Sequence, residues 1–138
     1  MHILLTGASR GIGAATLAAL HADGHKVAGQ STQGDDDLLA ADFTDPDAPR
    51  RLFEQAFAAL DERIDVVVNN AGVFEPVSEK AGDEEWRAAW ARTLQINLQA
   101  SADLCRLAIA HLRSKEEPGG RIVNVASRAA YRGDSPAH

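Results

Sequence analysis

The chain has 138 residues, of which 45% are hydrophobic and 25% are charged, and its formal net charge is -6 at pH 7. These proportions are typical of a globular domain and exclude a disordered chain. The negative charge argues against nucleic acid as a partner, because proteins that bind phosphate backbones concentrate positive charge. No apolar run approaches the roughly 18 residues of a membrane span, and no basic and apolar leader precedes the first apolar run. We therefore expect a cytoplasmic protein that binds neither nucleic acid nor a membrane.

Short apolar strands alternate with helical segments along the chain. Strands are predicted at residues 2–6, 26–31, 38–42, 64–69 and 121–126. The first helix is predicted from Gly11 to about Asp23 and ends at Gly24, which suits the left-handed conformation just past a helix end. This alternation predicts an α/β fold with a Rossmann-type, doubly wound parallel sheet and helices on both faces.

The second helix has a clear predicted start and one apolar face. Asp45 is suited to cap it, and Pro46 is suited to its first position. The apolar face has the spacing i, i+3, i+4, i+7 in Phe53, Ala56, Phe57 and Leu60. The link at residues 32–42 is too short and too rich in glycine and aspartate for a crossover helix, so a loop or a single turn is expected there.

A long helix is predicted from about Asp83 to Arg113, and one side of it is mostly apolar. This stripe consists of Trp86, Trp90, Leu94, Asn97, Ser101 and Ala108. A polar amide on an apolar face has to be hydrogen-bonded, because leaving it unpaired costs about 1 to 3 kcal/mol. The single cysteine, Cys105, falls in the same helix and is interpreted as a small core hydrophobe. No metal site is expected.

The most informative segment, T-G-A-S-R-G-I-G at residues 6–13, joins the first strand to the first helix. Gly7 allows a tight turn, Gly11 lets backbone approach a ligand, and Gly13 lets the helix pack close to the sheet. Backbone N–H groups and the positive end of the helix dipole then point at one place, which suits a pyrophosphate. Glycine is common in turns, so the motif gains its weight from its place between a strand and a helix.

Each of the other predicted strands also ends in small or polar residues. The ends are Gln30-Ser31-Thr32, Asp42-Phe43, Asn69-Asn70-Ala71-Gly72 and Asn124-Val125-Ala126-Ser127. Ligands of doubly wound sheets bind beyond the carboxyl ends of the strands, where the strand order reverses. These ends therefore suit a nucleotide that lies across the strand tips.

Together these motifs resemble the short-chain dehydrogenase/reductases, most closely those of the 3-oxoacyl-[acyl-carrier-protein] reductase type. The matching parts are the glycine motif, Asp42, N-N-A-G at residues 69–72, Asn97, and N-x-x-S at residues 124–127. Extended, epimerase-like members carry G-x-x-G-x-x-G instead. The resemblance implies an oxidoreductase that transfers hydride between a nicotinamide dinucleotide and a carbonyl or secondary alcohol, with residues 1–138 as the N-terminal portion of a longer single domain.

The resemblance also implies roles for individual residues. The residues expected to contact the cofactor are Gly7, Ser9, Arg10, Gly11, Ile12, Gly13, Thr32, Asp42, Phe43, Asn70, Ala71 and Gly72. Asp42 accepts a hydrogen bond from the adenine amino group, and the backbone of Phe43 assists. Asn70, Ala71 and Gly72 form the floor under a ribose. Taken by itself, Asp42 could equally be a turn or cap residue, and the N-N-A-G segment a simple loop.

Two residues are expected to serve the chemical step. The resemblance implies that Ser127 donates a hydrogen bond to the substrate carbonyl, and that Asn97 holds a water in a proton relay. On local grounds Ser127 is equally suited to a turn or a helix cap.

The family's Tyr-x-x-x-Lys motif is expected about thirteen residues after the serine, past His138, where the chain ends. Tyr131 follows Ser127 by only four residues, and Ser135 rather than lysine lies four beyond it, so Tyr131 is given no catalytic role. Residues 133–138 resemble the run that leads to the family's tyrosine. We expect residues 1–138 alone to be inactive and the fifth strand to have an unpaired edge.

Cofactor choice depends on charge near the ribose, where NAD sites place an acid and NADP sites place arginine or small polar groups. Ser31 and Thr32 at the second strand tip, with Arg10, favour NADP. Asp35, Asp36 and Asp37 follow closely and keep NAD possible, although an acidic run is usually a solvated loop. The alternative function is a dinucleotide-binding or sensing module without catalysis. The family commonly forms dimers or tetramers through the long helix, so a homo-oligomer is expected.

Overall fold

The computed structural model describes residues 1–132, and the predicted resemblance at residues 133–138 lies outside them. The strands are β1 (His2–Leu5), β2 (Lys26–Ser31), β3 (Leu38–Ala40), β4 (Val66–Asn69) and β5 (Arg121–Asn124). The helices are α1 (Gly11–Ala22), α2 (Ala48–Ala59), α3 (Asp83–Leu94), α4 (Ala100–Ser114) and α5 (Ala129–Arg132), with a π-helical turn, η1 (Gln95–Gln99), between α3 and α4.

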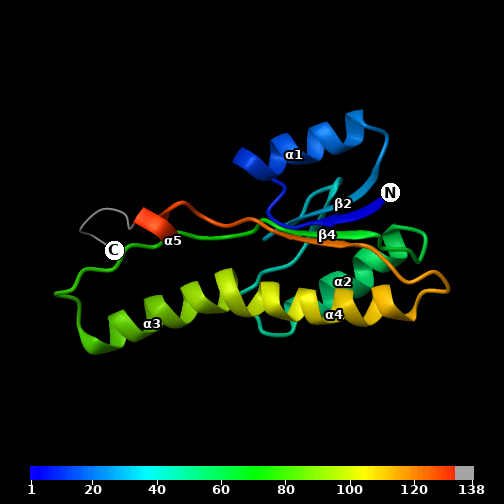
Figure 1. Ribbon diagram of the computed structural model, residues 1–138. Helices are drawn as coiled ribbons and strands as arrows, with labels where there is room; N and C mark the ends of the chain where they lie inside the picture. Colours follow the sequence, from blue (N-terminus) through cyan, green and yellow to red (C-terminus); the bar gives the residue numbers. More distant parts are fainter. Residues whose placement is uncertain (133–138) are drawn as a thin grey trace.

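All five strands are parallel and lie in the order β3-β2-β1-β4-β5. Figure 1 shows α1 on one face of this sheet and α2, α3 and α4 on the other. The strand order reverses between β1 and β4, which places a topological switch point at their carboxyl ends. The predicted α/β, doubly wound parallel sheet is confirmed. Among the described residues β5 pairs with β4 alone, so it is an edge strand.

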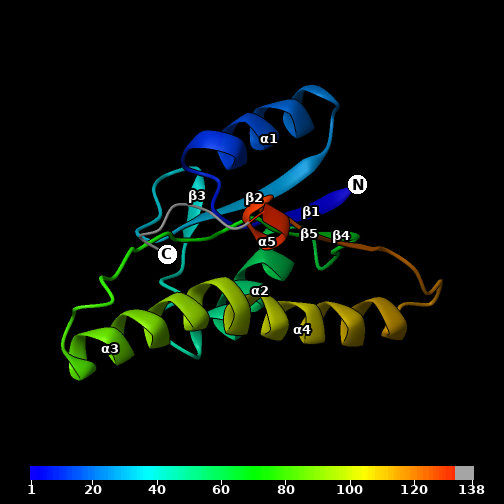
Figure 2. The ribbon, with the colours of Figure 1, turned by 60° about the vertical axis from the view of Figure 1, so that its left-hand side comes forward.

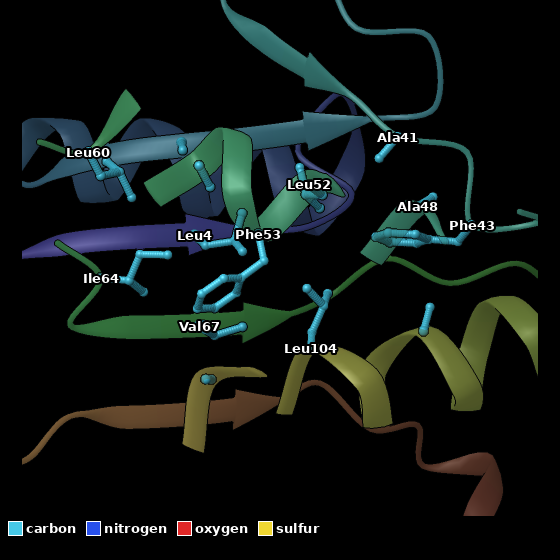
Figure 3. Packing of buried hydrophobic residues seen from close by; sticks show 14 of the residues in the cluster. Leu4, Ala41, Phe43, Ala48, Leu52, Phe53, Leu60, Ile64, Val67 and Leu104 are labelled. Carbon is cyan, nitrogen blue, oxygen red and sulfur yellow. The ribbon is translucent and has the colours of Figure 1, made fainter. Parts of the chain in front are cut away.

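The larger part of the core lies between the sheet and the helices α2 and α4. Leu4 and Val67 from the sheet are fully buried there, and they pack with Phe53 of α2 and Leu104 of α4. Figure 3 shows these side chains converging from the two layers. A smaller cluster under α1 is built around Leu5, Ala8 and Leu38. Alanine and glycine on α1 therefore allow that helix to lie close to the sheet.

Several strands are shorter than predicted. β3 ends at Ala40 because the chain turns at Asp42, whose Oδ1 accepts the N–H of Thr44 at 2.9 Å. β4 begins at Val66. The backbone of Ile64 before it is turned toward His111, whose Nε2 lies 3.1 Å from the carbonyl oxygen and 3.3 Å from the nitrogen of Ile64. The link before β3 holds no helix, as predicted, and is closed by the Asp35 carboxylate, which accepts the N–H groups of Asp37 and Leu38.

The predicted start of the second helix is wrong by two residues. α2 begins at Ala48 after Asp47, and its first turn contains Pro49 rather than Pro46. The reason is a tight turn before the helix, in which Asp45 Oδ1 accepts the N–H of Asp47 at 2.9 Å. The predicted apolar face is confirmed, because Phe53, Ala56 and Leu60 are all buried.

The predicted long helix is interrupted, and four of the six residues of its predicted stripe are exposed. The π-helical turn at Gln95–Gln99 shifts the register of the face. Trp86, Trp90 and Leu94 before the turn are 39%, 48% and 46% exposed, whereas Ala108 after it is buried. The stripe is therefore not one buried face. Among the described residues no helix is long and apolar enough to cross a membrane, and no cluster of three side chains suits a metal ion.

Candidate functional site

A cavity of about 400 Å³ lies at the switch point, beyond the carboxyl ends of β1 to β4. All of the residues predicted to contact the cofactor line it, namely Gly7, Ser9, Arg10, Gly11, Ile12, Gly13, Thr32, Asp42, Phe43, Asn70, Ala71 and Gly72. The fold thus brings together residues that are far apart in the sequence. The two residues predicted for the chemical step, Asn97 and Ser127, are not part of this lining.

The glycine turn between β1 and α1 is shaped so tightly that two of its glycines have no room for a side chain. A Cβ on Gly13 would lie 1.9 Å from the carbonyl oxygen of Gly7, and a Cβ on Gly7 would lie 2.8 Å from Cα of Ala71. A Cβ on Gly11 would meet no atom within 4 Å, yet this residue has a φ of +55° and borders the cavity. The first N–H groups of α1 have no partner within the helix, so they are available to a ligand.

Gln30, a buried residue of β2, holds this turn from one side. Its side-chain oxygen accepts the N–H of Gly7 at 2.9 Å, and its side-chain nitrogen donates to the carbonyl of Ala41 at 2.6 Å. The carbonyl of Gln30 also accepts the N–H of Ala8 at 2.7 Å. A single buried amide therefore joins the turn after β1 to the strand β2 and to the residue after β3.

Thr6 and Asn70 hold the turn from the other side, where β1 meets β4. The Thr6 hydroxyl accepts the N–H groups of Asn70 and Ala71, each at 3.0 Å, and Thr6 is 1% exposed. The Asn70 side chain donates to the carbonyls of Thr6 and Gly7 at 3.0 and 3.1 Å. The predicted ribose floor thus has a second task, because Asn70 uses its amide nitrogen to fix the glycine turn.

Asp42, at the other end of the cavity, is exposed and ionised. Its Oδ1 accepts the N–H and the hydroxyl of Thr44 at 2.9 and 2.8 Å. These two hydrogen bonds lower the pKa of the Asp42 carboxyl below its ordinary value, and the charge of Arg92 adds to the effect. The carboxylate is therefore a hydrogen-bond acceptor at neutral pH. The neighbouring Phe43 is buried and packs its ring into the core.

The glycine turn and the tip of β2 bring polar and positive groups, rather than acids, to the cavity. Arg10 and Thr32 both line it, and Asp42 is the only acid among the described lining residues. Asp35, Asp36 and Asp37 are exposed and are not in the lining. Their exposure agrees with the interpretation of the acidic run as a solvated loop.

Asn97 lies in the π-helical turn and holds the segment after β4. Its side-chain oxygen accepts the N–H of Val73, and its side-chain nitrogen donates to the carbonyl of the same residue, both at 2.8 Å. Both functional atoms of the amide are thus paired, as predicted for this residue, although Asn97 is exposed rather than on a buried face. Val73 borders the large cavity, and with Asn97 it also borders a smaller, more apolar hollow of about 200 Å³.

Ser127 lies two residues before α5 and makes a local contact. Its hydroxyl oxygen accepts the N–H of Ala129 at 3.2 Å, so it occupies the turn position weighed from the sequence. Tyr131, four residues after Ser127, is 92% exposed. Cys105 is partly buried and is not purely a core hydrophobe, because its sulfur accepts a hydrogen bond from the Asn69 amide at 3.3 Å.

Three residues with polar side chains hold or line the site and were not predicted as such: Thr6, Gln30 and Arg92. Thr6 was noted only as part of the motif, and Gln30 only as a strand end. An amide near the end of a strand predicted to be buried was the available signal for Gln30, because a buried amide has to find partners. Arg92 of α3 reaches the cavity through the tertiary fold alone, and nothing in its local sequence indicates this.

A sequence profile of the family described as short chain dehydrogenase matches residues 1–135. The chain belongs to the short-chain dehydrogenase family. A short chain dehydrogenase of Emericella variicolor is 35% identical over 142 residues, which cover 96% of this chain and 55% of that protein. The chain therefore spans about half the length of this relative. The predicted family is confirmed.

Two solved structures of this family show the same fold. A short chain dehydrogenase from Burkholderia cenocepacia in complex with NADP has a TM-score of 0.81 and 30% identity, and the match covers 97% of this chain and 58% of that one. A 3-ketoacyl-(acyl-carrier-protein) reductase from Brucella melitensis, complexed with NADH, has a TM-score of 0.79 and 25% identity, with 98% and 60% covered. The first of these neighbours is complexed with NADP and the second with NADH.

Proposed function

We propose that the cavity binds NADP(H) and that the protein transfers hydride between this cofactor and a carbonyl or secondary alcohol substrate. The observation that carries the proposal is the glycine turn, in which Gly7 and Gly13 leave no room for a Cβ and Gly11 leaves backbone open to a ligand. Such a turn at a helix N-terminus suits a pyrophosphate. When bound, the nicotinamide ring supplies or accepts the hydride.

The adenosine half of the cofactor is assigned to the tips of β3 and β4. The ionised Asp42 is suited to accept a hydrogen bond from the adenine amino group, and the backbone of Phe43 lies next to Asp42. Ala71 and Gly72 offer a floor without bulky side chains. Asn70 supports that floor by holding the glycine turn with its amide.

The preference for NADP over NAD rests on charge. Arg10 and Thr32 line the cavity, and the acids at residues 35–37 do not. A 2′-phosphate is attracted to an arginine and is not repelled by a threonine. The neighbours support a nicotinamide dinucleotide without choosing between the two, since one is complexed with NADP and the other with NADH.

The test is a titration of the protein with NADPH and with NADH. The unmodified protein is expected to bind NADPH more tightly, and Thr32→Asp is expected to reverse this order by repelling the 2′-phosphate. Thr32→Asn is the matched control, because it changes the shape without adding charge. Tighter binding of NADH by the unmodified protein would contradict the NADP preference, and binding of neither would contradict the cofactor site itself.

For the chemical step we assign the Ser127 hydroxyl to the substrate oxygen. The hydroxyl accepts one hydrogen bond from Ala129, so its own proton is free to be donated. Asn97 fixes Val73 beside the cavity, and its predicted contact to a relay water is part of the same proposal. A second candidate, a dinucleotide-binding module without catalysis, is favoured by the position of Ser127 outside the cavity lining. The effect of Ser127→Ala on turnover distinguishes the two.

We also propose that the protein associates through the long helical segment. Its exposed apolar side chains are Trp86, Trp90, Leu94, Leu98 and Ile109. Trp86, Trp90, Leu94 and Leu98 recur every four residues along the segment, and a large exposed apolar patch is uncommon on monomers. Light scattering of the protein and of a Leu98→Glu variant is expected to show a dimer or tetramer that the substitution weakens, and a monomer in both samples would contradict the proposal.

A further inference from the structure

Arg92 is a charged residue of α3 that lines the cofactor cavity, although most of the lining comes from the loops that follow the strands. It lines the cavity together with Asp42 and Ile96, and it also borders a shallow outer hollow that Thr44 shares. Thr44 is the residue that holds Asp42. Arg92 therefore lies at the corner of the cavity assigned to the adenine. In Figure 2, α3 and the segment leading to it lie on the side of the sheet opposite to α1.

Glu75 fixes the orientation of this arginine. Arg92 Nε donates to both oxygens of Glu75, at 2.9 and 3.1 Å. Because only Nε is used in these bonds, the rest of the planar guanidinium is available to another group. The pKa of Arg92 is raised above its ordinary value by the hydrogen bond to Glu75, and also by the charges of Glu75 and Asp42. Arg92 is therefore a permanent, oriented cation at the edge of the cavity.

We propose that Arg92 is a cofactor-binding residue whose guanidinium packs against the adenine ring, and that Glu75 is the positioning residue that holds it there. This inference rests on the proposed function, because it requires a dinucleotide in the cavity. Asp42 and the backbone of Phe43 would then take the edge of the ring. Guanidinium groups pack favourably on the faces of aromatic rings and of nucleobases.

The surrounding charges favour the base over a phosphate as the partner of Arg92. Two carboxylates, Glu75 and Asp42, act on the arginine and offset its charge. An added phosphate would meet their repulsion, whereas the face of a neutral ring would not. The cation that suits a 2′-phosphate is Arg10, which has no acidic partner among the described residues and lies in the glycine turn.

The ion pair also connects cofactor binding to the segment between β4 and α3. Glu75 belongs to this segment and borders the smaller hollow, while Arg92 borders the cofactor cavity. An adenine packed on Arg92 would thus stabilise the position of Glu75 and of the residues next to it.

The experiment measures the dissociation constants of NADPH, NADH, 5′-AMP and nicotinamide mononucleotide for the protein and its variants. The two mononucleotides, 5′-AMP and nicotinamide mononucleotide, are measured both by direct titration and by competition with the dinucleotide. Arg92→Leu is expected to weaken NADPH, NADH and 5′-AMP alike, by roughly threefold to thirtyfold, which is the range for such contacts. Nicotinamide mononucleotide, which lacks the adenine, is expected to bind unchanged. Glu75→Gln is expected to show the same selective pattern with a smaller loss.

Two further variants separate the contact from charge and from helix stability. Arg92→Lys keeps the charge without the planar surface and is expected to recover only part of the loss. Arg87→Leu is the matched control, because Arg87 lies on the same helix, is 80% exposed and does not line the cavity, and no change is expected. Thermal unfolding of each variant verifies that it is folded.

Three results would overturn the inference: unchanged affinities in Arg92→Leu, an equal loss for nicotinamide mononucleotide, or a loss for NADPH that exceeds the loss for NADH. The last would assign Arg92 to the 2′-phosphate. If the unmodified protein bound neither dinucleotide, the proposed function would fail together with this inference. If the unmodified protein bound both dinucleotides and Arg92→Leu bound each of them as tightly as the unmodified protein does, only the inference on Arg92 would fail.

Discussion

The glycine-turn end of the sheet and the β5–α5 end are built in opposite ways. At the glycine turn, Thr6 and Gln30 are 1% and 3% exposed, and their side chains bond to backbone that lies more than ten residues away. At the other end, Val125 and Tyr131 are 46% and 92% exposed, and the Ser127 hydroxyl bonds only two residues ahead. The glycine turn assigned to cofactor binding is thus fixed by contacts between distant parts of the chain, whereas Ser127, assigned to the chemical step, is held by a local contact.

The energetic reason for this difference is the burial of polar groups. A buried amide or hydroxyl that loses its partners costs about 1 to 3 kcal/mol, so a satisfied network holds its members in one arrangement. An exposed hydroxyl can exchange its partner for water at little cost. Substitutions in the two regions should therefore differ in whether they change stability, affinity or rate.

The largest effect is expected from Gly13→Ala. Its new Cβ would lie 1.9 Å from the carbonyl oxygen of Gly7, so the turn has to open. Overpacking of this kind costs about 3 kcal/mol or more, and we expect NADPH affinity to fall at least about a hundredfold. Chemical denaturation and NADPH titration measure the two effects.

The matched control for this substitution is Gly82→Ala. The Cβ would meet no atom within 4 Å, and the φ of Gly82 is -65°, which alanine adopts readily. It is expected to change neither stability nor affinity by a measurable amount. Equal behaviour of the two variants would show that the glycine turn is not the rigid part of the molecule.

In the full-length protein, Ser127→Ala in the other region should change the rate alone. The hydroxyl is assigned to the substrate oxygen, and loss of such a donor costs on the order of a hundredfold to a thousandfold in turnover. NADPH affinity and unfolding free energy should stay nearly the same, because Ser127 is exposed and lies outside the cavity lining. Steady-state rates with an accepted ketone provide the measurement, and an unchanged turnover number would refute the role and favour the non-catalytic module.

Gln30→Leu should reduce stability and affinity together. The substitution leaves the N–H of Gly7 and the carbonyl of Ala41 without their partner. We expect an unfolding free energy lower by about 2 kcal/mol, with weaker NADPH binding because the turn is no longer held. Denaturation midpoints and titration report both quantities. Loss of stability with full affinity would mean that the brace supports the fold but not the site.

A third polar cluster, at the amino ends of the strands, sharpens the comparison because it is buried but remote from the cavity. Burial opposes ionisation of Asp65, but hydrogen bonds from the His2 N–H, Arg63 and Lys115 outweigh it and hold the pKa of this carboxyl well below its usual range. A carboxyl whose pKa is lower in the folded than in the unfolded state stabilises the fold fully at a pH above its unfolded-state pKa. This stabilisation is lost as the pH falls from the unfolded-state pKa through the folded-state pKa.

Asp65→Asn is therefore expected to lower the unfolding free energy by about 2 kcal/mol at pH 7, and the difference from the unmodified protein should shrink as the pH falls below about 4. Urea denaturation at pH 7 and at pH 3.5 measures it. NADPH affinity at pH 7 should not change. A stability difference that stays constant with pH would contradict the assigned ionisation of Asp65.

Much of the fold follows from local patterns in the sequence. β1 and β4 consist mainly of buried apolar residues, and Gly24, just past the end of α1, has the left-handed φ of +75° expected for it. The start of α2 could not be placed, because Asp45 and Asp47 are both suited to cap a helix and only the turn between them decides. The π-helical turn around Asn97 also has no local signal, since it depends on the pairing of that amide with Val73.

The cavity lining was predictable where residues belong to motifs that resemble those of the family. The glycine turn and Asp42 after β3 belong to this group. Gln30 and Arg92 do not, because their roles depend on which backbone or cavity the fold brings within reach of their long side chains. Exposure of Trp86 and Trp90 was likewise not predictable, since helical spacing defines a face but not what covers it.

The most direct test of the central claim is amide hydrogen exchange of the protein with and without NADPH. If the dinucleotide lies across the strand tips, protection should increase at the backbone N–H groups of Gly11, Ile12, Phe43 and Gly72, which line the cavity. The N–H groups at the amino ends of the strands, such as that of Asp65, should exchange as before. Protection that is absent from the glycine turn, or confined to other parts of the chain, would contradict the assignment of this cavity as the cofactor site.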